Sequence, residues 1–215
     1  MTRIKVCGIT AEEDRDAAVG AGADALGFVV DVPVDTDREL EPARAAELIA
    51  DVPPFVTTAL VTMPADAERA VELYERTGAD VVQLHNDLSP EAVGAVADAT
   101  RARVLKAISA DLEESARYVP VADALLVDSR DSTGAGGTGE AHDWAATRAI
   151  RESVDVPVVV AGGLTPDNVA EAVRTVEPYA VDVSSGVERR EGRKDHDAVR
   201  AFVEAVASER RAVSP

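Results

Sequence analysis

The chain has 215 residues, of which 40 are Asp or Glu and 22 are Lys or Arg, so its formal charge is −18. A chain of this length can bury its own hydrophobic core without a disulfide or metal, and its acidity excludes nucleic acid as the expected partner. The single cysteine, Cys7, excludes a disulfide framework and a Cys-based metal cluster. No apolar run approaches the ~20 residues of a membrane span, and no leader is recognised after Met1, so we expect a cytoplasmic protein without a membrane partner.

Short apolar segments of β type alternate along the chain with Ala-, Glu- and Arg-rich segments of helical period. The predicted strands are residues 4–7, 25–30, 56–61, 81–84, 104–107, 124–127, 156–160 and 179–183. Capping residues indicate helix starts at Thr10, Ser89 and Thr165, and a proline follows the last two. No linker or low-complexity segment divides the sequence.

A weak internal repeat supports this alternation. Small residues followed by Asp introduce even-numbered strands at residues 22–24, 78–80 and 121–123, and residues 179–182 open the eighth strand. Continuous apolar strands separated by helices are typical of a buried parallel sheet. We therefore predict an α/β fold, a single (βα)8 barrel domain with a parallel eight-stranded core over residues 1–215, in which residues 208–215 are a frayed tail. A doubly wound sheet would carry a Gly-x-Gly-x-x-Gly motif after its first strand, where Cys7-Gly8-Ile9-Thr10 stands instead.

The acidic residues are spread through the predicted helices, for example at residues 12–14 and 111–114. Such a surface repels itself, and salt screens that repulsion. We interpret the pattern as a halophilic acidic surface, adapted to a salty cytoplasm, whose stability depends on salt concentration.

A (βα)8 barrel places its site at the carboxyl ends of the strands, with phosphate near the seventh and eighth strands. Loops rich in glycine and small residues let backbone N–H groups approach an anion, and we expect a short helix after Ser185 to direct its N-terminus at it. The predicted phosphate-binding residues are Gly136, Gly137, Thr138, Gly139, Gly162, Gly163, Ser184, Ser185 and Gly186. The alternative is a set of turns without a ligand.

Side chains that could act as acids, bases, ligands or substrate contacts also stand at the strand ends. Cys7 ends the first strand, where it is either a small buried hydrophobe or a thiolate base. Asp128 ends the sixth strand and is a helix cap, an acid/base group or a metal ligand. Gln83 and His85 end the fourth strand, as structural residues or as substrate contacts. No second carboxylate or His pair has metal-ligand spacing, so no metal is expected.

The same residues carry a family resemblance: the chain resembles the phosphoribosylanthranilate isomerases, (βα)8 enzymes of tryptophan biosynthesis. The matching motifs are KVCGIT at 5–10, GADALGF at 22–28, VQLH at 82–85, LVDS at 126–129, GGTG at 136–139, DW at 143–144, AGGL at 161–164 and VDVSSGVE at 181–188, with Gly192, Lys194 and Asp195. The resemblance implies that Cys7 is the general base, Asp128 the general acid and Arg38 the ligand of the anthranilate carboxylate. Two departures stand out: Arg38 has acidic neighbours and a longer spacing from the second strand, and Asn86 replaces a glycine.

The implied reaction is an Amadori rearrangement of N-(5-phosphoribosyl)anthranilate to 1-(2-carboxyphenylamino)-1-deoxyribulose 5-phosphate. It requires Asp128 to start protonated and Cys7 to start close to a thiolate, and it needs no cofactor. The implied partner is a small phosphorylated substrate, and a homodimer or association with another tryptophan-pathway enzyme is left open. The alternative functions are another sugar-phosphate isomerase of the phosphate-binding barrel class and a non-catalytic phosphate-ligand binder. An aspartate on the first strand would favour the related isomerase of histidine biosynthesis, and Cys7 stands there instead.

Overall fold

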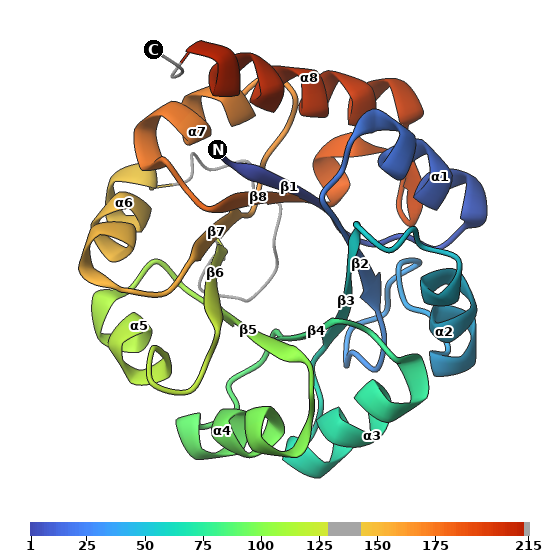
Figure 1. Cartoon of the computed structure of the whole chain (residues 1–215), viewed down its shortest axis with the longest axis vertical. Helices are drawn as coiled ribbons and strands as arrows, with labels where there is room; N and C mark the ends of the chain where they lie inside the picture. The colour runs from blue at the N-terminus through green and yellow to red at the C-terminus, as the bar shows by residue number, and fades with distance from the viewer. Residues whose placement is uncertain (129–142, 213–215) are drawn as a thin grey trace.

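The computed structural model describes residues 1–128 and 143–212. Within these residues, parallel strands close into a barrel in the order β1 to β8, ringed by helices (Figure 1). The strands are β1 Arg3–Val6, β2 Ala25–Val29, β3 Thr57–Thr62, β4 Val81–Leu84, β5 Arg103–Ile108, β6 Ala124–Asp128, β7 Val158–Ala161 and β8 Ala180–Val183. The helices are α1 Glu12–Ala21, α2 Pro42–Ala50, α3 Ala67–Thr77, α4 Pro90–Ala99, α5 Leu112–Tyr118, α6 Trp144–Ser153, α7 Val169–Val176 and α8 His196–Ala212. The predicted (βα)8 barrel is therefore confirmed.

Each predicted strand overlaps an observed one, with differences of one or two residues at the ends. β7 begins at Val158 rather than at residue 156, because Pro157 has no N–H to donate to the ladder. Cys7 lies one residue beyond β1, yet its N–H still donates to the carbonyl of Val183 at 2.8 Å. The backbone of β8 thus holds Cys7 at the carboxyl end of the barrel.

The repeated aspartates have a structural role at the opposite end of the barrel. Oδ2 of Asp24 accepts the N–H of Ile4 in β1 at 2.8 Å. In the same way Asp80 accepts from Thr58 in β3 and Asp123 accepts from Val104 in β5, both at 2.8 Å. Each of these aspartates therefore fastens an even-numbered strand to the preceding odd-numbered one. Asp182 lies within β8 and faces a different partner, described below.

Of the predicted helix caps, only Ser89 is confirmed: its hydroxyl accepts the N–H of Ala92 at the start of α4. Thr10 does not cap α1, because its hydroxyl donates to the carbonyl of Gly192, far along the chain. Thr165 does not cap α7, which begins three residues after Pro166, because Asn168 accepts the N–H of Thr165 and holds it in a turn. A tertiary contact thus replaces the predicted cap at Thr10, and a local turn replaces the one at Thr165.

Residues 208–212, which the sequence predicts as part of a frayed tail, continue α8 to Ala212. The helix is held by its buried face, where Phe202 and Val206 are fully covered. Glu209 extends this attachment by accepting a hydrogen bond from Arg174 of α7 at 2.7 Å. Residues 213–215 lie outside the described part of the chain.

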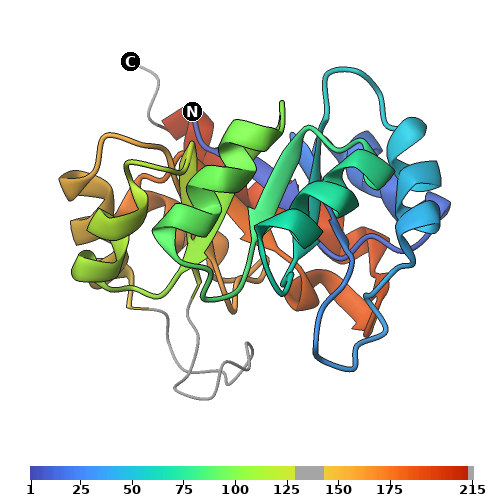
Figure 2. The same cartoon turned by 90° about the horizontal axis from the view of Figure 1, so that it is seen from below.

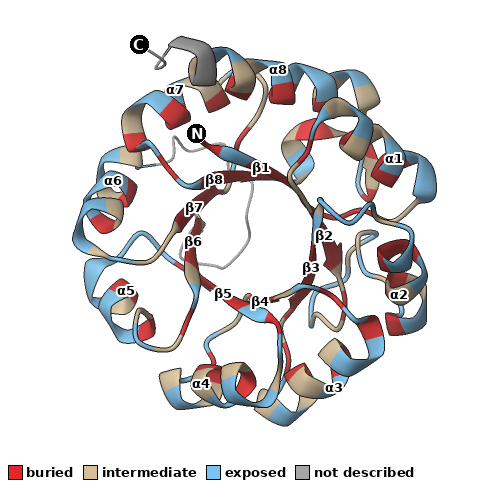
Figure 3. Ribbon diagram, in the orientation of Figure 1, coloured by how far each residue is buried: buried red, intermediate tan, exposed pale blue. Residues whose placement is uncertain are grey.

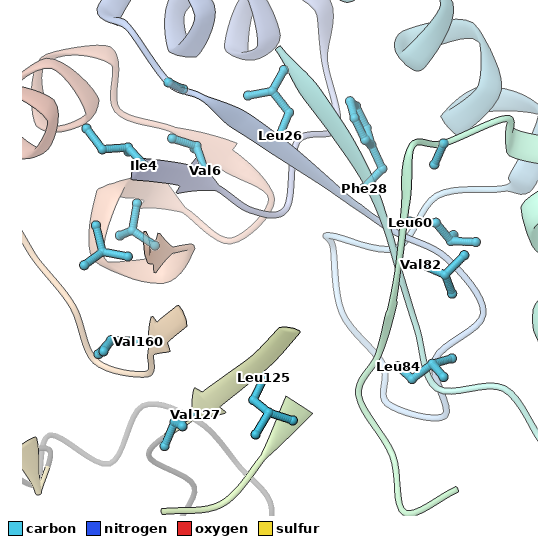
Figure 4. Packing of buried hydrophobic residues seen from close by; sticks show 14 of the residues in the cluster. Ile4, Val6, Leu26, Phe28, Leu60, Val82, Leu84, Leu125, Val127 and Val160 are labelled. Atoms are coloured by element: carbon cyan, nitrogen blue, oxygen red, sulfur yellow. The ribbon is translucent and has the colours of Figure 1, made fainter. Parts of the chain in front are cut away.

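The hydrophobic core has two layers, and burial follows the strands while the outer helix faces are exposed (Figure 3). The larger layer fills the space between barrel and helices, and Figure 4 shows its strand side chains, among them Ile4, Phe28 and Val160. The smaller layer lies inside the barrel and includes Leu105, Leu126 and Val159. Burying each such side chain contributes about 1.5–3 kcal/mol relative to leaving it in water.

The segment between β2 and α2 extends from one end of the barrel and lies beside a small hairpin, formed by β9 Glu188–Arg190 and β10 Arg193–Lys194 (Figure 2). Thr36 and Arg38 of this segment bond to Glu191 in the hairpin turn. These contacts position the loop over the carboxyl ends of the strands. None of the helices in the described residues is both long and apolar enough to span a membrane.

Candidate active site

A pocket of about 450 Å³ opens at the carboxyl ends of the strands. The predicted site residues that line it are Cys7, Arg38, Gln83, His85, Asp128, Gly162, Gly163, Ser184, Ser185 and Gly186. Gly136, Gly137, Thr138 and Gly139 lie outside the described residues. A second hollow, of about 480 Å³, lies at the amino-terminal ends of the strands, and none of the predicted site residues lines it. The barrel thus gathers the predicted residues at its carboxyl-terminal mouth.

Cys7 is 7% exposed and faces this pocket. Burial raises the pKa of its thiol, and the carboxylate of Asp182 adds to that effect. The ammonium groups of Lys5 and Lys194 act in the opposite direction and favour the thiolate. The positive field that a cysteine base needs is therefore present, but burial outweighs it.

Asp128 is the last residue of β6, and its Oδ2 lies 3.3 Å from Nε2 of His85. Nδ1 of His85 in turn lies 3.2 Å from the amide nitrogen of Gln83, which is buried. Because that amide donates to Nδ1, the proton of a neutral His85 lies on Nε2, facing Asp128. Gln83 thus holds His85, and the ring of His85 in turn lies against Asp128.

Arg38 reaches the pocket despite its altered spacing. Its Nε and Nη2 donate to the two oxygens of Glu188 at 3.0 and 2.7 Å, and Nη1 donates to Glu191 at 2.9 Å. Its acidic partners in the structure therefore come from β9 and the hairpin turn, about 150 residues along the chain, whereas Glu39 accepts the N–H of Val32. This bidentate pair fixes the plane of the guanidinium.

Glu188 and Lys194, quoted in the sequence motif without a role, complete this arrangement. Lys194 is fully buried and donates to Glu188 at 2.8 Å. Burial disfavours the charged carboxylate, but hydrogen bonds from Arg38 and Lys194 outweigh it and hold the pKa of Glu188 below its ordinary value. Burial also lowers the pKa of Lys194. The sequence signal for these two residues was a Lys and a Glu flanking a glycine turn. That pattern by itself is also typical of an exposed hairpin, so it did not indicate a place in the site.

The loops after β7 and β8 contain the described part of the predicted phosphate site. Gly162 and Gly163 have φ of 84° and 64°, a backbone shape that favours glycine. Asn168 holds this turn by donating to the carbonyl of Gly163 at 2.9 Å. The short helix expected after Ser185 is a single 3-10 turn, η1, at Ser185–Val187. A turn this short has little macrodipole, so an anion here would depend on individual N–H groups.

Asn86, where the resemblance leads us to expect glycine, ties two loops together. Its amide nitrogen donates to the carbonyl of Pro64 at 2.6 Å and so joins the end of β4 to the loop after β3. Within the described residues, no group of three or more His, Cys, Asp or Glu side chains is placed to hold a metal ion.

A closed parallel barrel with a thiol, a carboxyl group and glycine turns at its carboxyl-terminal mouth has the layout of a (βα)8-barrel enzyme. Residues 4–205 match the family model described as N-(5'-phosphoribosyl)anthranilate (PRA) isomerase. The chain belongs to this family.

Named relatives and solved structures support the same family assignment. The N-(5'-phosphoribosyl)anthranilate isomerase of Halobacterium salinarum is 59% identical over 206 residues, covering 94% of each chain. The structure also superposes on the crystal structure of phosphoribosyl anthranilate isomerase from Thermotoga maritima, with a TM-score of 0.85 and 34% identity over 97% of this chain and 100% of that one. A second crystal structure describes that Thermotoga maritima protein as dimeric. A phosphoribosyl anthranilate isomerase in complex with reduced 1-(o-carboxyphenylamino)-1-deoxyribulose 5-phosphate superposes at 0.82 with 33% identity, over 97% and 100%. The similarity to a protein of a halophile agrees with the acidic composition.

Proposed function

We propose that this chain catalyses the Amadori rearrangement of N-(5-phosphoribosyl)anthranilate to 1-(2-carboxyphenylamino)-1-deoxyribulose 5-phosphate, a step of tryptophan biosynthesis. The observation that carries the proposal is the convergence of Cys7, Asp128 and Arg38 on one pocket that the glycine turns after β7 and β8 also line. Such a pocket offers an acid, a base and a binding group for each end of a substrate that carries a phosphate and a carboxylate.

Two proton transfers account for the reaction. Asp128 donates a proton to the ring oxygen, the ring C–O bond breaks, and the substrate opens to an iminium ion. The Cys7 thiolate then removes the proton from C2, the C2–H electron pair forms the new double bond, and the iminium becomes an enolamine. Tautomerisation of the enolamine yields the ketone. General acid and general base each contribute typically about 10²–10⁴-fold to such a rate.

The neighbours of these groups fit the division of labour. His85, held by Gln83, lies 3.3 Å from Asp128 and fixes the orientation of its carboxyl group. Arg38 donates four of its five N–H groups to Glu188, Glu191 and the hydroxyl of Thr36, so one N–H on Nη2 is left for the anthranilate carboxylate.

The phosphate is assigned to the loops after β7 and β8. Gly162, Gly163, Ser184, Ser185 and Gly186 line the pocket, and residues this small let backbone N–H groups approach an anion. The predicted residues Gly136 to Gly139 join the same proposal from the sequence alone. Holding the phosphate here and the carboxylate at Arg38 would fix the ribose carbons between the acid and the base.

Two substitutions test the acid and the base. We expect Cys7→Ala and Asp128→Asn each to reduce kcat by about 10²–10⁴-fold while the protein still binds a phosphate-bearing analogue of the product, measured by calorimetry. Asp98→Asn, which removes a carboxylate exposed on α4, is the matched control and should turn over like the unmodified protein. Turnover near that of the control in either site variant would remove that residue from its role.

Assembly and location complete the proposal. The sequence leaves a homodimer and association with another tryptophan-pathway enzyme open, and the dimeric Thermotoga maritima relative supports the first, which we adopt. Light scattering in molar KCl tests it: a dimer has twice the 22.5 kDa of one chain, and a mass of 22.5 kDa would refute it. We place the protein in the cytoplasm, in line with its single unpaired cysteine.

A further inference from the structure

A lysine lies inside the barrel directly below the proposed base. Lys5 stands two residues before Cys7, so the two side chains point to the same, inner face of the barrel wall. Lys5 is 4% exposed, and its Nζ lies 2.9 Å from both carboxylate oxygens of Asp182 in β8. Neither Lys5 nor Asp182 has a role in the reaction as proposed above.

The adjacent strand leaves room for the lysine and the cysteine to meet. β2 pairs with β1, and Gly27 of β2 has no side chain at this point. A Cβ on Gly27 would lie 2.8 Å from Sγ of Cys7 and 3.0 Å from Nζ of Lys5, so both atoms occupy the space that a larger residue would fill. The ammonium of Lys5, bonded to Asp182, and the sulfur of Cys7 are therefore neighbours across this glycine.

We propose that Lys5 is a positioning residue for the reaction: its ammonium, held by Asp182, stabilises the thiolate of Cys7 inside the barrel. This inference rests on the proposed role of Cys7 as the base. Burial disfavours the charge on Lys5, but Asp182 and Cys7 outweigh burial and raise the pKa of the lysine, so that it stays protonated. Asp182 therefore keeps the ammonium charged, and the ammonium offsets part of the cost of a buried thiolate.

The other charges around Cys7 are already engaged. Lys194 in β10 and Arg38 in the loop after β2 also interact with the sulfur electrostatically, and both are paired with the same carboxylate, Glu188. Asp182 is the acidic group whose charge opposes the thiolate. Lys5 is thus the cation that lies beside the sulfur at Gly27 and has a partner other than Glu188.

The test uses the fact that Cys7 is the only cysteine in the chain. The ultraviolet absorbance of its thiolate and its rate of alkylation by iodoacetamide therefore report one group, in the ligand-free protein and without turnover. We expect Lys5→Met to move the absorbance step to higher pH and to slow alkylation at mildly alkaline pH about tenfold, since an opposite charge at close range typically changes a thiolate population by at least that factor. The rising limb of kcat/KM against pH should move by the same amount.

Asp182→Asn separates an electrostatic role from a packing role. It removes the charge that opposes the thiolate and leaves the thiolate as the partner that keeps Lys5 protonated, so we expect its absorbance step at lower pH than in the unmodified protein. The double variant Lys5→Met/Asp182→Asn removes both members of this buried ion pair, so neither is left unpaired and the test is protected against misfolding. The absorbance step of the double variant should lie at higher pH than that of Asp182→Asn alone. Lys106→Met, which removes another buried lysine from β5, is the control and should leave the step in place.

The opposite results would overturn the inference. Variants that only loosen the packing would expose the thiol and move the step to lower pH with or without Lys5. An unchanged or lower step in Lys5→Met, or a double variant that matches Asp182→Asn, therefore refutes the role of Lys5. Failure of the proposed function shows separately, as full turnover of Cys7→Ala.

Discussion

Replacing Gly186 by alanine should weaken the hold of the barrel on the substrate phosphate. A Cβ at this position would lie 1.8 Å from the carbonyl oxygen of Leu164, whereas ordinary contacts begin at 3.4 Å. Because the obstacle is backbone, η1 and the loop after β7 must separate by about 1.5 Å, and a displacement of about 1 Å in a substrate-binding group can reduce a rate about 100-fold. We expect kcat/KM to fall by about that factor, chiefly through KM, since phosphate contacts bind substrate and transition state alike.

Calorimetric titration with inorganic phosphate and with a product analogue measures the same loss without turnover. Gly20→Ala is the control: its Cβ would meet nothing within 4 Å, and alanine stabilises a helix interior relative to glycine by about 0.5–1 kcal/mol. The control should bind phosphate like the unmodified protein and melt at a slightly higher temperature. If Gly186→Ala binds phosphate as tightly as the control does, the assignment of the phosphate to these two loops is wrong.

Three further results are expected. Glu191→Gln removes the charge that pairs with Nη1 of Arg38 in a half-exposed ion pair, so KM should fall about two- to fivefold at low salt. The difference in KM between variant and unmodified protein should shrink in molar KCl, and equal KM values at low salt would contradict the prediction. Because burial raises the pKa of Cys7, kcat/KM should increase with pH through the alkaline range. Folding stability should decrease over the same range, because folding disfavours the ionised thiol, and Cys7→Ala should remove that decrease. A kcat/KM that does not change with pH below pH 9 would count against the thiolate. Lys194→Met should lower the free energy of unfolding in urea by about 3 kcal/mol, the low end for a broken buried ion pair, because Arg38 still pairs with Glu188; a loss near zero would mean that the pair is solvated.

The barrel could be predicted from sequence because its strands are short, apolar and separated by helical patterns, and this signal is local. The helix caps show where local reasoning ends. Thr10 has the chemistry of a cap, but its hydroxyl bonds to Gly192, a residue 182 positions away. The end of the chain shows the same limit, since α8 continues past residue 208 through contacts with α7.

The site residues also divide into those whose place could be predicted from the sequence and those whose partners could not. Cys7 and Asp128 could be placed at the mouth because each stands at the carboxyl end of an apolar segment, and strand ends are fixed by the fold. The carboxylates that hold Arg38 and Lys5 come from distant segments, and neither pairing has a signal in the local pattern. A hint was present for Lys5 and Asp182, since a charged residue inside a short apolar strand of a barrel needs a partner of opposite charge.

The most direct test is conversion of the substrate itself. Purified protein in molar KCl is mixed with freshly prepared N-(5-phosphoribosyl)anthranilate, and the fluorescence of its anthranilate group is followed, with the Cys7→Ala variant measuring spontaneous breakdown. Our account predicts enzyme-dependent conversion to the aminoketose that disappears in the variant. A folded protein that consumes the substrate no faster than the variant does would contradict it.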